Sequence, residues 1–137
     1  MEQLKLFEHT VYANPIPHLH SRHGKFPGAV KLLSGEILVL LEIGEAFESA
    51  DSRTYVTRSS DNGNTWNFQG QLYSYPQKCN YSEALKPTLL KNGELIAVGY
   101  RFDRSNPDLP IGNPKTGGLL PGRDVVSFSS DHGKTWS

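Results

Sequence analysis

Cysteine is nearly absent from this sequence, with Cys79 the single one in 137 residues. A lone cysteine cannot form a disulfide within the chain, so nothing points to an oxidising compartment. No apolar run is long enough to span a membrane, and the acidic start of the chain is unlike a secretory signal. These absences predict no membrane contact and favour a cytoplasmic location.

An excess of one charge sign is also lacking. Lysine and arginine together number 14, as do aspartate and glutamate, so the formal net charge is zero. A neutral chain has no general attraction for nucleic acid, and no nucleic-acid partner is expected. The mean hydropathy of −0.47 indicates a modest core, while 13 glycines and 9 prolines indicate many turns and short strands.

One eight-residue motif occurs twice, as SSDNGNTW at residues 59–66 and SSDHGKTW at residues 129–136. In each copy the aspartate can accept hydrogen bonds from N–H groups just ahead of it, and the glycine can adopt a positive φ. The threonine hydroxyl can close the same loop, and the tryptophan can pack on the sheet beneath. Both copies are therefore predicted to be rigid hairpin corners. Their constant residues, assigned a structural role, are Ser59, Asp61, Gly63, Thr65, Trp66, Ser129, Asp131, Gly133, Thr135 and Trp136.

The runs around these corners predict an all-β chain. Strands are expected at residues 26–33, 36–41, 54–58 and 66–72, and residues 36–41 are continuously apolar, as in a strand covered on both faces. The pattern then restarts, with a strand–turn–strand at residues 85–98 and a third strand at 124–128. Residues 2–13 alternate loosely and are expected to form an edge strand.

Four short antiparallel strands repeated after tens of residues are typical of β-propeller blades. Residues 1–24 then form an N-terminal strand and loop, 25–75 a first blade, and 76–137 a second blade without its last strand. A closed ring takes about 4–8 blades. The chain is therefore expected to be the N-terminal piece of a longer propeller, with apolar blade faces that promote self-association.

The motif S-x-D-x-G-x-T-W is the Asp-box, and residues 25–136 resemble the first two blades of six-bladed sialidase-like propellers. The resemblance implies a retaining, exo-α-sialidase-like glycoside hydrolase that cleaves terminal sialic or related acidic sugars, with no metal and no cofactor. It places the Asp-boxes on the rim, away from the catalytic centre, so they indicate the fold rather than the activity. Non-enzymatic propellers carry the same box.

The resemblance also implies roles for individual residues. Lys25-Phe26-Pro27 matches the sialidase Arg-Ile-Pro triplet, but lysine lacks the bidentate fork with which arginine grips a carboxylate. Asp51, 26 residues after Lys25, matches the acid/base aspartate, which protonates the departing oxygen and then activates water. Lys86 replaces an aspartate that binds substrate before the Pro-Thr of blade two. The two lysines predict an altered, still anionic ligand, and the family's Tyr–Glu pair and other arginines are expected from later blades.

Each assignment has a plainer alternative. Asp51 is otherwise one of several solvated loop carboxylates, and Lys25 is otherwise a lysine at a strand end. Further candidates for the cleft, each alternatively a surface or packing residue, are Arg53, Arg101, Asp103, Tyr100 and Phe47. Three histidines at positions 18, 20 and 23 suggest zinc, but a polar loop is favoured because no partner cluster lies elsewhere. Three functions stay open: a glycoside hydrolase, a catalytically altered propeller that binds acidic glycans, and a protein-interaction scaffold.

Overall fold

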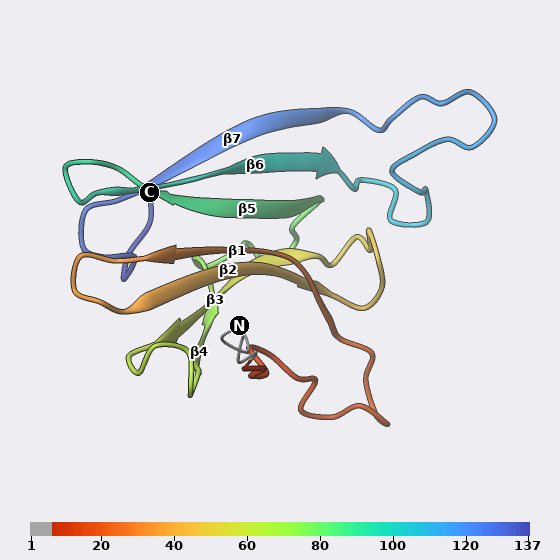
Figure 1. Ribbon diagram of the computed structural model, residues 1–137. Coiled ribbons are helices and arrows are strands. Elements are labelled where there is room, and N and C mark those ends of the chain that lie inside the picture. The colour runs from red at the N-terminus through yellow and green to blue at the C-terminus, as the bar shows by residue number, and fades with distance from the viewer. Residues whose placement is uncertain (1–6) are drawn as a thin grey trace, which may run out of the picture.

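The computed structural model describes residues 7–137, and all regular structure in that range is β-strand (Figure 1). The all-β prediction is thus confirmed. The strands are β1 (His23–Lys31), β2 (Ile37–Gly44), β3 (Arg53–Ser59), β4 (Asn67–Gln71), β5 (Tyr81–Leu89), β6 (Leu95–Asp103) and β7 (Gly122–Ser129). Among the described residues no helix is long and apolar enough to cross a membrane.

The strands form two separate antiparallel sheets. The first sheet has the order β1-β2-β3-β4 and the second has the order β5-β6-β7. In both sheets each strand pairs with the next one along the chain, so neither contains a crossover. Residues 7–13 form no strand, so the expected edge strand is wrong for that part, and residues 2–6 of the same prediction lie outside the described range.

The second sheet repeats the order of the first three strands of the first sheet, and the same backbone pairing follows its corner. In the first sheet, Asn67 at the start of β4 pairs with Arg58 of β3. In the second, Ser137 and Phe128 of β7 exchange backbone hydrogen bonds of 3.0 and 3.2 Å at the equivalent place. The two corners therefore turn the chain in the same way.

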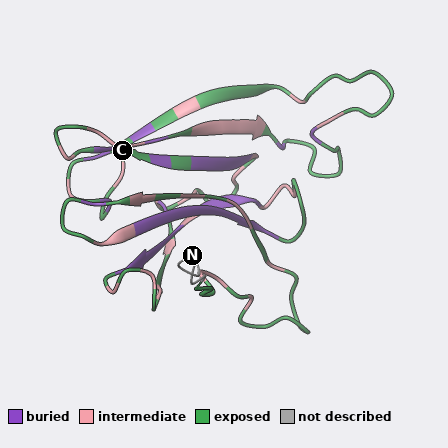
Figure 2. Ribbon diagram, viewed as in Figure 1, coloured by how far each residue is buried: buried purple, intermediate pink, exposed green. Residues whose placement is uncertain are grey.

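A hydrophobic core lies between the two sheets. Leu38, Leu40 and Val56 of the first sheet pack with Leu85 and Leu95 of the second, and all are at most 4% exposed. Figure 2 shows purple, buried stretches on β2 and β5, with β1 between them in this view. Complete burial of such side chains contributes about 1.5–3 kcal/mol each, so this layer holds the sheets together.

The other face of the first sheet is covered by a different part of the chain. Val39, Leu41 and Ile43 of β2 form a second buried cluster. Tyr12, from the segment before β1, and Trp66, from the first corner, pack against it. Strand β2 is thus buried on both faces, in agreement with its continuously apolar sequence.

The outer face of the second sheet has no such cover within the described residues. Val98, Val126 and Phe128 are 46%, 51% and 53% exposed on it. Strand β7 shows long green, exposed stretches in Figure 2. In the first sheet, the corresponding face is the one that packs on the second sheet. The exposed apolar face agrees with the expectation from sequence, whereas self-association itself stays a prediction.

Both corners close through the same hydrogen bonds. Asp61 Oδ1 accepts the Thr65 N–H at 2.9 Å and Oδ2 accepts the Thr65 hydroxyl at 2.7 Å. Asp131 does the same with Thr135 at 2.9 and 2.6 Å. These bonds, led by the threonine hydroxyl, lower the pKa of Asp61 to about 2 and lower that of Asp131 as well.

Candidate functional site

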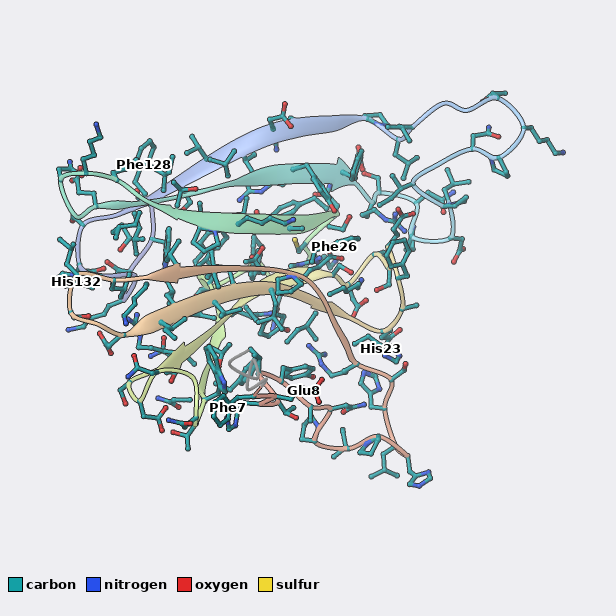
Figure 3. The ribbon with its side chains drawn as sticks, viewed as in Figure 1. Phe7, Glu8, His23, Phe26, Phe128 and His132 are labelled. Carbon is teal, nitrogen blue, oxygen red and sulfur yellow. The ribbon has the colours of Figure 1, made fainter. Side chains whose placement is uncertain are left out.

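The candidate residues gather at the end of the sheets opposite the corners. This end carries the β2–β3 loop (residues 45–52) and the long β6–β7 loop (residues 104–121), both on the right of Figure 1. In Figure 3, His23 and Phe26 mark this end, while His132 of the second corner lies at the other. The structure thus separates the corners from the residues proposed for chemistry.

Asp51 is half-buried in the β2–β3 loop and closes that loop through its carboxylate. Its Oδ1 and Oδ2 accept the Glu45 N–H at 3.0 and 3.2 Å. A Cβ built on Gly44 would come within 3.1 Å of Asp51 Oδ1 and within 2.5 Å of two serine hydroxyls. Glycine is therefore required where the loop folds back on β2. These backbone hydrogen bonds fix the carboxylate against the start of the loop.

Lys25 lies beside this loop with its ammonium group fully used. Its Nζ donates to Glu42 Oε1 at 2.9 Å, the Ala46 carbonyl at 2.7 Å and Ser52 Oγ at 2.9 Å. The side chains of Lys25 and Glu42 are only 9% and 4% exposed. An ammonium has three N–H donors, so a carboxylate ligand would have to replace one of these acceptors.

A β-bulge between Lys25 and Gly28 places Lys25 in this position. Inside the bulge, Phe26 has a positive φ of 49°, a backbone conformation that residues other than glycine rarely adopt. Its ring packs on that of Phe47, with centroids 5.4 Å apart. Bulges and such backbone strain concentrate at functional sites, which supports a functional role for this end. Phe47 thus has a packing partner while remaining 68% exposed.

A buried carboxylate that the sequence analysis missed lies between the sheets at the same end. Glu83 of β5 is completely buried and accepts hydrogen bonds from Tyr73 Oη at 2.7 Å, Tyr75 Oη at 2.6 Å and Arg101 Nε. Burial, with the Glu83 charge nearby, raises the pKa of both tyrosines, so their phenols stay protonated donors. No periodicity or motif singled out Glu83, since its partners come from separate segments.

Arg53 and Arg101, two of the predicted cleft residues, lie on either side of this network and both contact the ring of Tyr81. Arg53 is buried and donates to the carbonyls of Ala50, Ser52 and Cys79. The guanidinium carbons of Arg53 and Arg101 lie 5.6 and 4.6 Å from the Tyr81 ring centroid. The structure therefore brings these two candidates together.

Asp103, Lys86 and Tyr100 occupy less central positions. Asp103 is exposed, and hydrogen bonds from the Ser105 hydroxyl and N–H to its Oδ1 lower its pKa. Lys86 is exposed on β5, next to the backbone of Gly28 in β1. Tyr100 packs on Phe102 with ring centroids 5.1 Å apart. Their proposed roles in binding stay predictions.

The histidine-rich segment contains no cluster able to hold a metal within residues 7–137. His23 Nε2 lies 2.8 Å from Ser21 Oγ, and His20 Nε2 lies 3.4 Å from Glu45.

A different feature of this end was not anticipated from sequence. The guanidinium of Arg104 is buried, and its Nε and Nη1 have no hydrogen-bond partner in the described part of the chain. The buried hydroxyl of Ser82 also has no partner there.

Comparison with known proteins supports the fold and leaves the activity open. No family model and no curated protein sequence matches this chain. A crystal structure of a protein of unknown function from Dyadobacter fermentans DSM 18053 superimposes with a TM-score of 0.62 at 23% sequence identity. The match covers 86% of this chain and 36% of that one, so the chain spans about a third of the length of this neighbour.

Proposed function

We propose that the two sheets are blades of a six-bladed, sialidase-like propeller whose function is to cleave terminal acidic sugars from glycans. The observation that carries the proposal is the position of Asp51. Its loop lies beside a strained bulge and binds two buried cations, Lys25 and Arg53, through its carbonyl groups, at the end of the sheets away from both corners. Two sheets that share the order of their first three strands and the same corner support the propeller.

The chemistry assigned to this chain is a proton transfer. Protonated Asp51 donates its proton to the departing glycosidic oxygen, which leaves as an alcohol while the carboxylate remains. The same carboxylate then removes a proton from the water that releases the sugar, and so is protonated again. The nucleophile of a retaining reaction is not assigned to any residue of this chain.

The test is the Asp51→Asn variant of the protein expressed from its complete coding sequence. Turnover of natural sialosides should fall by about 10²–10⁴-fold, the usual contribution of a general acid. Turnover of aryl sialosides with good leaving groups should fall far less, because those groups depart without a proton. Glu48→Gln, in the same exposed loop, is the matched control. Equal losses on both substrates would exclude Asp51 as the acid.

A second candidate is a non-catalytic propeller that binds acidic glycans or protein partners. The state of Lys25 favours it: Glu42, Ala46 and Ser52 already accept its three hydrogen bonds, so no donor is left to bind the carboxylate of a substrate. A glycan array distinguishes the two kinds of partner, since a protein scaffold should retain no sugar. Retention of acidic glycans without any turnover would favour this second candidate.

A further inference from the structure

A cleft at the loop end of the second sheet has a polar lining that the proposed proton transfer does not use. Its volume is about 320 Å³. Arg101 of β6 and Arg123 of β7 line it, together with Asn80, Tyr81 and Asp103. Small-molecule pockets measure about 300–1,000 Å³, so this one is of a size for a single sugar ring.

The two arginines occupy directly opposed positions on neighbouring strands. Arg101 pairs with Arg123 in the β6–β7 register, so both side chains project from the same face. Like charges placed opposite one another destabilise a sheet. Glu83 and Tyr73 hold Arg101 through Nε and Nη2. Its Nη1 has no partner in residues 7–137, and the exposed side chain of Arg123 makes no hydrogen bond or ion pair with the residues described. An anion between them would remove the repulsion.

The surroundings of the cleft carry more positive than negative charge. Arg101 and Arg123 line it, and the guanidinium of Arg53 lies on the ring of Tyr81, which is also part of the lining. Against these three cations, Asp103 is the one carboxylate among the described lining residues, and Glu83 is bound by Arg101.

We propose that this cleft binds the carboxylate of an acidic monosaccharide between Arg101 and Arg123. Guanidinium groups form the strongest protein hydrogen bonds to carboxylates. Asp103 uses Oδ1 for Ser105 and has Oδ2 left to accept a sugar hydroxyl. The Tyr81 phenol can donate another hydrogen bond. This inference deepens the proposed function and rests on it only for the ligand being a sugar.

The experiment measures binding of D-glucuronate, N-acetylneuraminate, D-glucose and inorganic sulfate by calorimetry, on the same protein expressed from its complete coding sequence. At least one sugar acid should bind, and neither glucose nor sulfate should bind as tightly. Arg123→Gln should weaken that binding about tenfold or more, while Arg123→Lys should recover part of it, because a point charge remains without the planar fork. Lys134→Gln, an exposed cation in the second corner, is the control and should change nothing.

The outcomes separate this site from the hydrolase proposal. If Asp51→Asn abolishes turnover but leaves binding intact, both proposals hold. If the protein has no turnover but binds the sugar acid through Arg123, the binding site is supported and the hydrolase proposal is rejected. Equal binding of sulfate would reduce the cleft to a general anion site and overturn the sugar assignment. Absence of binding, or binding that Arg123→Gln leaves unchanged, would overturn the site itself.

Discussion

The buried carboxylate of Glu83 offers a direct test of what holds the loop end of the two sheets together. Its side chain is fully buried and accepts three hydrogen bonds, from Tyr73, Tyr75 and Arg101. Glu83→Gln keeps the shape but removes the charge, and its amide N–H₂ then meets donors rather than acceptors. Breaking a buried ion pair by removing one partner costs about 3–5 kcal/mol.

That cost is a large share of the total stability of a domain, which is usually about 5–15 kcal/mol. Urea unfolding, followed by the fluorescence of Trp66 and Trp136, measures it. With a slope of about 1–3 kcal/mol per molar urea, a loss near 3 kcal/mol lowers the unfolding midpoint by about 1–3 M. Glu94→Gln, in the exposed turn before β6, is the matched control and should shift stability by less than about 0.5 kcal/mol.

A double-mutant cycle identifies the origin of the loss. Arg101→Met removes the cation that Glu83 neutralises, so the pair of substitutions leaves no uncompensated buried charge. The double variant should therefore lose less than the sum of the two single losses, with an interaction energy of about 0.5–3 kcal/mol. A Glu83→Gln midpoint no lower than that of Glu94→Gln, or strictly additive losses, would refute this account of the network.

Three further predictions concern other parts of the chain. Because the folded pKa of Asp61 lies near 2, below the unfolded value of about 3.9, its stabilising effect is present above pH 4 and is lost as pH falls toward 2. Asp61→Asn should flatten acid unfolding curves in that window, while an unchanged curve contradicts the assignment. Lys25→Met leaves Glu42 buried and unpaired, so the free energy of unfolding should fall by about 3–5 kcal/mol. Adding Glu42→Leu should restore much of that stability. Phe128→Ser should reduce self-association in light scattering, whereas Leu33→Ser, in an exposed turn, should not; equal effects would exclude the outer face of the second sheet.

Features that arise within short segments could be predicted from the order of the residues. The chemistry of Asp61, Gly63 and Thr65 acts within a few residues, so the hydrogen bonds of the corner follow from the order of the residues alone. Alternating and continuous apolar runs likewise predicted the all-β class and the doubly covered strand β2, because strand burial follows a two-residue period. The segment at residues 7–13 was misassigned, since Val11 and Tyr12 pack on the first sheet as irregular chain without pairing to it.

Which side chains meet at the loop end depends on how the two sheets pack and could not be predicted from the sequence. Glu83, Tyr73 and Arg101 come from three segments whose spacing follows no periodic pattern, so their hydrogen bonds could not be read from the sequence. The state of Lys25 was equally hidden. Its charge was visible in the sequence, but the bulge and the nearby loop supply the acceptors that occupy it. The opposition of Arg101 and Arg123 depends on the β6–β7 register across a loop of 18 residues, and long-range pairing of this kind is established only when the sheet forms.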